Sequence, residues 1–401
     1  MSPSTHPIRQ AVILAGGLGT RLRPLTAERP KPMIQINGRP FLDYLLDLLR
    51  EQGITRVLVL LGYRADDVIA HYRAHPAPGL DVQFEISPVE DETGQRLKRA
   101  EHLLDDTFLL LYCDNYWPLD LGKAWAARQA AGKPLQITVY RNRDGRSRDN
   151  VSIDERGIVI AYDKSRTTPG LLGVDIGFAL VDRSIVAALP EDNVSFEAYA
   201  YPRAVAAGDL SAFATEHRYY SIGGLDRLEE TARFLERRPT VLLDRDGVLN
   251  RKMNRAQYVC DWSQWQWMPG ALEALARLRD NGYRMIVATN QPGIARGHLS
   301  TAGLDSIHAH MRADVRAAGG DIAAIYHCPH GWDEGCDCRK PAPGMLFQAQ
   351  KDFALDLSRH TFIGDDDRDR MAADAAGCSF IQVSDDRPLA RAVDELLNRD
   401  A

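Results

Sequence analysis

Residues 240–250 read TVLLDRDGVLN, and the architecture of the second half of the chain follows from them. Their apolar start predicts a buried strand at 240–243, followed at once by Asp244 and Asp246. Because side chains alternate along an extended segment, both carboxylates can face one site while Arg245 points away. Such a pair suits covalent phosphoryl transfer, with Asp244 as the nucleophile and Asp246 as the acid that later activates water. An Asp-x-Asp pair by itself is also common in calcium loops and turns.

Three later segments supply the other groups that this chemistry needs. The predicted strand 284–288 is followed by a hydroxyl and two amides that can hold phosphate oxygens, those of Thr289, Asn290 and Gln291. Arg339 and Lys340 offer cations to neutralise a phosphate. The predicted strand 361–363 leads into the acidic run GDDDRD at 364–369, which suits Mg²⁺. We therefore expect Mg²⁺ on Asp244, Asp246 and Asp365.

A cluster of cysteines lies between the first and second of these three segments. Cys328 and His330 are followed, after five intervening residues, by Cys336 and Cys338. Three thiolates and one imidazole can close a tetrahedral Zn²⁺ site, with no position left for water. We expect a structural zinc that holds the loop carrying Arg339 and Lys340. His327 is a competing ligand, and cysteines clustered without a metal are the alternative.

Together these segments resemble the four motifs of the haloacid-dehalogenase-like phosphatase superfamily, over about residues 240–385. The zinc loop is similar to that of D-glycero-D-manno-heptose 1,7-bisphosphate 7-phosphatases and of histidinol-phosphate phosphatases. Residues 289–297 and 338–345 look more like the heptose enzymes, and this resemblance implies that Arg296 also contacts substrate phosphate. The gaps between motifs leave no room for a large cap domain, so the resemblance implies an open site. Histidinol phosphate or another small phosphomonoester is the alternative substrate.

The first half carries a different motif, AVILAGGLGTRLRPLT at residues 11–26. A strand runs into three glycines within four positions, which lets the backbone approach phosphate oxygens closely. Arg21 can bind phosphate through two bonds, and Lys31 in RPKP adds a second cation. The motif lacks the Lys-Ser/Thr end of a P-loop and the last glycine of the dinucleotide fingerprint. The residues expected to contact a nucleotide are Leu14, Ala15, Gly16, Gly17, Gly19, Thr20, Arg21 and Lys31.

This motif resembles that of the sugar-1-phosphate nucleotidyltransferases, over roughly residues 8–235. Residues 11–63 are most similar to guanylyltransferases that act on heptose 1-phosphate. The resemblance implies attack of a sugar-phosphate oxygen on the α-phosphorus of a nucleoside triphosphate, with GTP expected and with Arg21 and Lys31 as catalytic cations. It also implies that Asp114 holds Mg²⁺ and that Lys164 contacts the sugar phosphate, although a solvated lysine is the alternative.

Two departures from this pattern concern the transferase chemistry. Ser221 stands where the family has a second metal-binding aspartate, and a neutral hydroxyl is a poor Mg²⁺ ligand beside a carboxylate. The stretch ETGQRL at 92–97 replaces a glycine-rich segment. Either the transferase uses a modified metal site, or this half binds its ligand without efficient turnover.

Composition and charge limit the classes of partner and the cellular location that we expect. The chain has 401 residues, 49 basic and 55 acidic, and a formal charge of −6, which argues against nucleic acid as the main partner. No apolar run reaches the ~18 residues of a membrane span, and the first residues show no signal-like apolar segment. We expect a cytoplasmic protein whose partners are sugar phosphates and a nucleoside triphosphate, with no membrane contact. The oligomeric state stays open.

The fold expected from these observations is α/β, with two doubly wound domains. Residues 1–237 are predicted to form a Rossmann-like nucleotidyltransferase domain, and residues 238–401 a capless haloacid-dehalogenase-like domain with a zinc loop. Helices are predicted at 41–52 and 228–238. The remaining predicted strands are 11–14, 56–61, 82–86, 108–112, 136–140 and 322–326. The hypothesis is a bifunctional enzyme of nucleotide-heptose synthesis; the alternative is a phosphatase with a catalytically weak binding module.

Overall fold

The computed structural model describes residues 6–400 except 144, 146, 255 and 256. The chain divides into two compact units, residues 1–235 and 236–401. In both units short apolar strands alternate with amphipathic helices, a pattern that produces parallel sheets covered by helices on both faces. None of the helices in the described part of the chain is long and apolar enough to cross a membrane.

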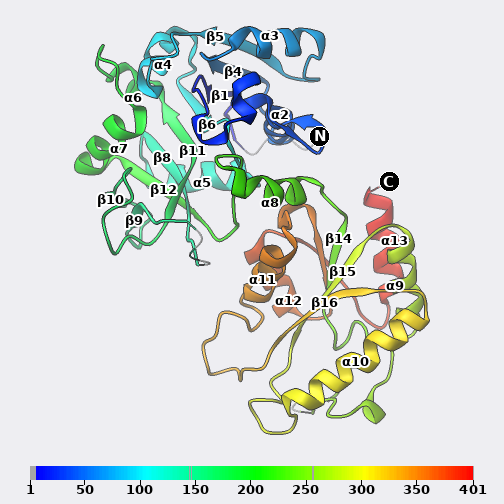
Figure 1. Ribbon diagram of the computed structural model, residues 1–401. Helices are drawn as coiled ribbons and strands as arrows, with labels where there is room; N and C mark the ends of the chain where they lie inside the picture. Colours follow the sequence, from blue (N-terminus) through cyan, green and yellow to red (C-terminus); the bar gives the residue numbers. More distant parts are fainter. Residues whose placement is uncertain (1–5, 144, 146, 255–256, 401) are drawn as a thin grey trace. The chain divides into compact units, whose positions relative to one another are not determined.

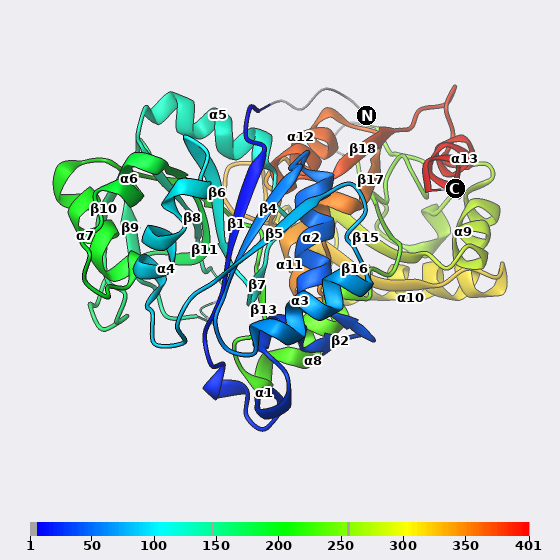
Figure 2. The same ribbon diagram turned by 90° about the horizontal axis from the view of Figure 1, so that it is seen from above.

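The first unit is built on a seven-stranded sheet of order β12-β8-β11-β6-β1-β4-β5 (Figure 2). Neighbouring strands are parallel except for β11, which runs antiparallel to both β6 and β8. Strand β1 therefore has β4 on one side and β6 on the other. The strands are β1 Gln10–Ala15, β4 Arg56–Leu61, β5 Asp81–Ile86, β6 Thr107–Tyr112, β8 Leu135–Tyr140, β11 Val174–Asp182 and β12 Leu210–Thr215.

Helices cover both faces of this sheet. Residues of α4 and α7 share a core with Val12 and Leu14 of β1. On the other face, Gln136 of β8 contacts the backbone of α5. The first amide of α5, that of Leu121, donates to the Gln52 side chain, which follows α2. The helices are α1 Leu25–Glu28, α2 Phe41–Glu51, α3 Ala65–Ala74, α4 Thr93–Arg99, α5 Leu121–Ala131, α6 Arg183–Ala187, α7 Phe196–Ala207 and α8 Leu225–Leu235.

Short elements complete the first unit. They are the two-stranded ladders β2 Gln35–Ile36 with β3 Arg39–Pro40, β7 Asn115–Tyr116 with β13 Tyr220–Ser221, and β9 Val151–Ile153 with β10 Val159–Tyr162, and the 3₁₀ turns η1 Thr20–Leu22, η2 Lys31–Met33 and η3 Glu101–Leu103. The β7–β13 ladder pairs Ser221 with Asn115, so the chain returns at Ser221 to the loop that carries Asp114.

The second unit is built on a five-stranded, wholly parallel sheet of order β16-β15-β14-β17-β18. Its strands are β14 Thr240–Leu243, β15 Arg284–Asn290, β16 Ile322–Cys328, β17 Thr361–Gly364 and β18 Ser379–Gln382. Its helices and turns are η4 Trp262–Gln264, α9 Ala271–Asp280, α10 Thr301–Ala317, α11 Gly344–Phe353, η5 Leu357–Arg359, α12 Asp367–Ala376 and α13 Leu389–Asp400. Between β14 and β15 the described residues form only η4 and α9.

The central strand of this sheet is buried on both faces. Val241 and Leu243 pack with α9, α10 and α13, whereas Leu242 packs with α11 and α12. Figure 1 shows these two groups of helices on opposite sides of the sheet. Full burial of each such side chain contributes about 1.5–3 kcal/mol to stability. The strand thus forms a rigid support for the aspartates that follow it.

The predicted α/β class with doubly wound domains is confirmed, and each predicted strand is present to within about two residues at either end. The predicted helix 41–52 is α2, which ends at Glu51. The predicted helix at 228–238 was misplaced: α8 spans Leu225–Leu235, starting directly after Gly224 and ending before Arg237, which has a φ of 53°. Strands β11, β12 and β18 were not predicted.

Candidate active sites and metal centre

The functional side chains of the second unit lie at the carboxyl ends of its strands. The chain moves from β14 to β15 and β16 on one side, then returns to β17 and β18 on the other. Such a reversal leaves a crevice beyond the strand ends, where α/β proteins bind ligands. Asp244 follows β14, Thr289 and Asn290 end β15, and Asp365 follows β17.

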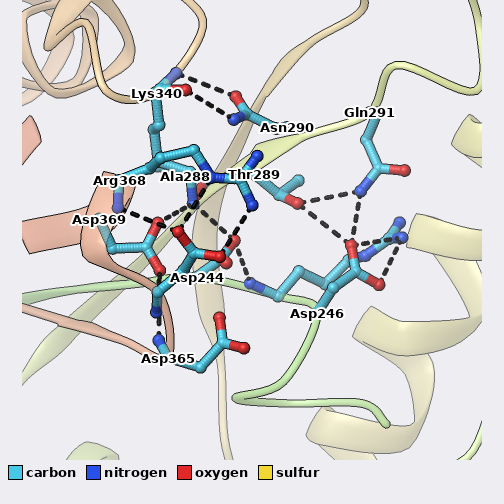
Figure 3. Close-up of polar contacts among 12 residues, drawn as sticks. Asp244, Asp246, Ala288, Thr289, Asn290, Gln291, Lys340, Asp365, Arg368 and Asp369 are labelled. Atoms are coloured by element: carbon cyan, nitrogen blue, oxygen red, sulfur yellow. Dashed lines mark hydrogen bonds and ion pairs between the residues drawn. The ribbon is translucent and has the colours of Figure 1, made fainter. Parts of the chain in front are cut away.

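Asp244 is held beside a buried lysine (Figure 3). The Lys340 Nζ atom lies 2.8 Å from Asp244 Oδ1 and 2.6 Å from Asp369 Oδ1. Burial raises the pKa of Asp244 to about 6 against the opposing effect of Lys340, because an ion is poorly solvated there. Burial opposes the charged form of Lys340 too, but the Asp244 and Asp369 carboxylates raise its pKa. Further positive charge at the site would favour the ionised, nucleophilic form of Asp244.

The Asp246 carboxylate points to a different set of partners. Both its oxygens lie 3.0 Å from Arg245 Nη2, while Asn250 Nδ2 and Gln291 Nε2 donate to it over 2.9 and 2.8 Å. Burial opposes ionisation, but Arg245 and these donors lower the pKa of Asp246 overall. Arg245 is 1% exposed and also donates to His308 Nε2. It therefore belongs to the support of Asp246 rather than to the surface.

The carboxylates that could share one metal ion are those of Asp244, Asp365 and Asp369, whose oxygens lie within 4.8 Å of one another. The expected set contained Asp246 in place of Asp369, and the partners of Asp246 explain the difference. Asp369 closes the first turn of α12, where its Oδ2 accepts from the amides of Asp365 and Asp366. Asp365 Oδ1 is buried and has no hydrogen-bond partner, as expected of an atom that faces a cation. An acidic group of this kind fits Mg²⁺.

Lys252 is a further cation that the sequence reading missed. Its Nζ lies 2.6 Å from Asp365 Oδ2 and 3.3 Å from Asp366 Oδ2. Burial by itself lowers the pKa of Lys252, but the contacts with Asp365 and Asp366 outweigh burial and raise it. No motif pointed to it, because it lies in the irregular segment after β14.

The predicted phosphate-binding residues divide into two groups. Thr289 Oγ1 and Gln291 lie beside Asp246, and Asn290 exchanges two hydrogen bonds with the backbone of Lys340, over 3.0 and 3.1 Å (Figure 3). Asn290 therefore positions the lysine loop. The two arginines that were also predicted to bind phosphate, Arg339 and Arg296, face the zinc loop instead. Arg339 donates to the His330 carbonyl. Arg296 donates to the Tyr258 hydroxyl and lies over the Trp332 ring.

The predicted zinc ligands converge on one point. The Sγ atoms of Cys328, Cys336 and Cys338 lie 3.2–3.6 Å apart, and His330 Nδ1 lies 3.5 and 3.2 Å from Cys328 and Cys338. All the cysteines are free thiols, and three thiolates with an imidazole suit a closed Zn²⁺ site. The competing ligand His327 faces the His308 ring of α10, with ring centroids 6.0 Å apart, and is outside the group.

In the first unit the glycine-rich loop follows β1, the strand that lies between β4 and β6 in the sheet. A cavity of about 370 Å³ opens there. The predicted nucleotide contacts line it except for Ala15: they are Leu14, Gly16, Gly17, Gly19, Thr20, Arg21 and Lys31. Gly19 has a φ of +63°, and a Cβ at Gly16 would lie 2.3 Å from the Arg96 guanidinium.

Arg96 explains how the loop is held. It is 4% exposed, and its guanidinium donates to the carbonyls of Gly16, Leu61 and Pro88 and to Ser87 Oγ. Burial lowers its pKa. In the sequence, residues 92–97 stand out only as an altered segment, because nothing in the local pattern indicates that Arg96 reaches the glycine loop.

Asp114 and Ser221 meet beside this cavity. Asp114 forms an ion pair with Lys31, and Ser221 Oγ accepts from the amide of Gly223. A Cβ at Gly223 would lie 3.0 Å from Ser221 Oγ and 3.7 Å from Asp114 Oδ2, so both side chains border the same small space. Lys164 lies elsewhere, with Ser195 and Glu197, and does not line this cavity. The centre thus has one carboxylate and one hydroxyl.

Comparison with known proteins separates the same two parts. The nucleotidyl transferase family profile matches residues 10–161, and the HAD-hydrolase-like profile matches residues 337–395. The D-glycero-beta-D-manno-heptose-1,7-bisphosphate 7-phosphatase of Pseudomonas aeruginosa is 44% identical over 146 residues, 36% of this chain and 81% of that protein. A D-glycero-alpha-D-manno-heptose-1,7-bisphosphate 7-phosphatase of Photorhabdus laumondii is 37% identical over 142 residues, 34% and 76% of the two chains.

Among solved structures, HddC from Yersinia pseudotuberculosis covers 57% of this chain and 100% of its own, with 28% identity and a TM-score of 0.50. The resemblances to a nucleotidyltransferase and to a haloacid-dehalogenase-like phosphatase are therefore confirmed, and the chain is an enzyme. By its similarity over most of the length of the curated relatives, it belongs to the heptose-1,7-bisphosphate 7-phosphatase family and carries a nucleotidyl transferase domain in the same polypeptide.

Proposed function

We propose that the chain catalyses two successive steps of nucleotide-heptose synthesis. Residues 238–401 remove the 7-phosphate of D-glycero-D-manno-heptose 1,7-bisphosphate, and residues 1–237 join the resulting heptose 1-phosphate to GMP from GTP, releasing pyrophosphate. The single observation that carries this proposal is the presence of both sites in one chain. The product expected from the phosphatase is the acceptor that the transferase resemblance implies. The anomer proposed is α, although curated relatives of both anomeric names are similar to the chain.

In the phosphatase step, an Asp244 oxygen attacks the phosphorus and forms an acyl phosphate. Lys340 neutralises charge on Asp244 and on the phosphate, while Asp246 donates a proton to the departing sugar oxygen. Asp246 then removes a proton from the water that hydrolyses the acyl phosphate. The incoming phosphate dianion adds negative charge near Asp246, which offsets the effect of Arg245 and favours protonation of the acid.

Two metals fit the residues of this unit. Mg²⁺ held by Asp244, Asp365 and Asp369 would offset the repulsion between the nucleophile and the phosphate. Zn²⁺ on Cys328, His330, Cys336 and Cys338 would be structural, since four protein ligands leave no open position. Through Arg339, which donates to the His330 carbonyl, the zinc loop would hold the segment leading to Lys340.

In the transferase step, the backbone of the glycine-rich loop, Arg21 and Lys31 bind the triphosphate. The nucleophile is already an anion, so positive charge contributes more to the rate than a base would. Asp114 would hold Mg²⁺. Ser221 favours a second candidate function, in which this unit binds its ligands without efficient turnover, because a hydroxyl replaces the second metal-binding carboxylate that the family resemblance implies.

The test supplies the heptose bisphosphate, Mg²⁺ and each of the four nucleoside triphosphates, and follows phosphate, pyrophosphate and the mass of the nucleotide sugar. We expect release of one phosphate, then pyrophosphate with GTP. Absence of phosphate release would overturn the phosphatase assignment, and phosphate without pyrophosphate would favour the binding-module alternative. A parallel assay with histidinol phosphate should show much slower hydrolysis; a preference for it would overturn the heptose substrate.

A further inference from the structure

A second cavity of about 840 Å³ adjoins the transferase centre of the first unit. It shares Arg21, Asp114 and Gly223 with the cavity of the glycine-rich loop. Three more arginines line it, and each comes from a different part of the chain. Arg148 lies between β8 and β9, Arg166 follows β10, and Arg227 lies in the first turn of α8.

These arginines form no close ion pair among the described residues, although Arg166 interacts electrostatically with Asp175, and Arg227 with Asp226 and Glu230. Among the residues that the structure describes, no carboxylate lies within 4.0 Å of the guanidinium nitrogens of Arg21, Arg148, Arg166 or Arg227. Neutral groups hold two of them instead. Arg166 Nη1 donates to the Arg148 carbonyl over 2.8 Å, and Arg227 Nη1 donates to the Tyr219 hydroxyl over 3.3 Å. They are oriented without being neutralised, which is the arrangement of a site for an external anion.

The acidic residues of the cavity do not cancel this charge. Asp114 is paired with Lys31, and Asp226 is exposed at the start of α8. Asp175 is 7% exposed and accepts from the Tyr162 hydroxyl and the Gly177 amide. Burial and the neighbouring Glu197 raise its pKa to about 7, so part of it is neutral at physiological pH. Ser221 removes one more negative charge that an aspartate would place there.

We infer that Arg148, Arg166 and Arg227 bind the phosphate of the sugar-phosphate acceptor and hold it against Arg21 and Asp114. The inference rests on the proposed function and assigns to these arginines the contact that the family resemblance implied for Lys164. Guanidinium groups can bind phosphate oxygens in pairs, whereas the Lys164 ammonium is already paired with Glu197.

The same arrangement accounts for Ser221. A carboxylate at that position would repel the acceptor phosphate unless a metal ion covered it. With a hydroxyl, the fixed arginines supply positive charge where an additional carboxylate-bound cation would otherwise be needed. An acceptor phosphate oxygen then bonds to the α-phosphorus of the nucleotide. The bond from that phosphorus to the bridging oxygen breaks, and pyrophosphate leaves with the electron pair.

The test uses the full chain with Arg166→Gln, Arg227→Gln and the double variant. Arg156→Gln is the matched control, because Arg156 lies in the β9–β10 turn, is 83% exposed and pairs only with Asp154 among the described residues. Each single variant should raise the KM for heptose 1-phosphate about tenfold, and the double variant about a hundredfold, while the KM for GTP changes less than twofold. The control should match the wild type, and the unchanged KM for GTP reports that the first unit, which carries the variants, is folded.

Two results would overturn the inference while leaving the proposed function intact: an unchanged KM for the sugar phosphate, or equal rises in both KM values. If the wild type shows no transferase turnover, the proposed transferase function fails separately. Calorimetric titration of heptose 1-phosphate into the full chain then decides the inference. Binding that the double variant weakens at least tenfold supports it, and no binding by the wild type, or equal binding by both, overturns it.

Discussion

At the scale of single residues, the phosphatase site is a set of charges kept apart by specific partners. The Lys340 side chain, which is 3% exposed, forms ion pairs with Asp244 and Asp369, while Arg245 forms an ion pair with Asp246. Burial raises the pKa of Asp244, whereas Arg245 and neighbouring hydrogen-bond donors lower that of Asp246. In the ligand-free site these shifts run against the proposed roles, because the nucleophile must be ionised and the acid protonated. Positive charge added near Asp244 and a substrate phosphate near Asp246 would shift both pKa values towards those roles.

Asp244→Asn should abolish phosphate release, by roughly 10⁴-fold or more, because the amide cannot form the acyl phosphate. Nucleotide affinity should stay within twofold, since the glycine-rich loop belongs to the other unit. Phosphate assay and calorimetry with GTP measure the two quantities. Asp280→Asn, at the exposed end of α9, is the control; a fall in nucleotide affinity with Asp244→Asn would contradict the assignment of separate sites.

His308 provides a pH-dependent prediction. Burial, the Arg245 cation and His327 lower its pKa to about 3, whereas the unfolded chain titrates near 6.5. Below pH 6.5 the unfolded state therefore binds the proton and the folded state does not. The free energy of unfolding should fall with decreasing pH between about 6.5 and 3, by up to about 1.4 kcal/mol per pH unit from this residue.

His308→Gln should remove that part of the slope, measured by urea unfolding at several pH values from 7 to 5. The comparison of slopes is independent of any packing defect in the variant. His310→Gln alters an exposed histidine of the same helix and should keep the wild-type slope. Identical slopes for His308→Gln and the wild type would rule out the buried neutral imidazole.

The residues that local sequence could identify are those that follow a strand. Asp244, Thr289, Asp365 and Asp114 were located because parallel strands end at one edge of a sheet. Asp369, Lys252, Arg96 and the arginines of the second cavity could not be found in this way. Their positions depend on the phase of a helix start, on irregular loops, or on side chains that reach across the unit, such as Arg96 to the Gly16 carbonyl.

At the scale of elements, the segment between β16 and α11 depends on its cysteines. Residues 329–343 contain no helix or strand, yet they carry Arg339 and Lys340 to the site. Besides the contacts of Lys340 with Asn290, Asp244 and Asp369, the cluster of Cys328, His330, Cys336 and Cys338 should hold this segment in place. Metal binding to such sites contributes roughly 10 kcal/mol or more in small zinc peptides.

Cys336→Ser should therefore lower the zinc content, the melting temperature and the phosphatase rate together. Loss of a few kcal/mol corresponds to a fall of about 10 °C in the melting of a unit of this size. Cys260→Ser changes a cysteine outside the cluster and serves as the control. Elemental analysis, calorimetry and phosphate assay measure the three effects; verified zinc loss with unchanged melting would contradict a structural zinc.

The unpredicted strand β11 shows why elements were missed. Its sequence includes Asp175 and Gly177, both unfavourable in strands, and Gly177 has a φ of +77°. The strand forms because β6 and β8 pair with it on either side, with an irregular register between Asp175 and Ala179. Such pairing is set by the sheet as a whole rather than by local propensity.

At the scale of the whole molecule, each proposed site is complete within one unit. The phosphatase residues all lie between 244 and 369, and the transferase residues between 14 and 227. The two steps should therefore be separable by mutation. A chain with Asp244→Asn and a chain with Arg21→Ala should each fail to convert the bisphosphate to a nucleotide sugar, because each lacks one step.

Mixing the two variant chains should restore conversion, with a lag while heptose 1-phosphate accumulates in solution. Mass spectrometry of the nucleotide sugar over time measures both features. Each variant assayed alone, at the same total protein concentration, is the control and should give no product. If the mixture stays inactive although each remaining step works alone, the intermediate does not pass through solution and the steps are not independent.

Both centres carry their own counter-ions. Lys31 lies against Asp114, Lys340 between Asp244 and Asp369, and Lys252 against Asp365. Without such cations, clustered carboxylates would repel one another and strain an apo-enzyme. The ammonium groups offset the repulsion between these carboxylates in the ligand-free protein, so its stability should not depend on the supply of magnesium. A shortage of magnesium would then lower the activity of the enzyme without unfolding it.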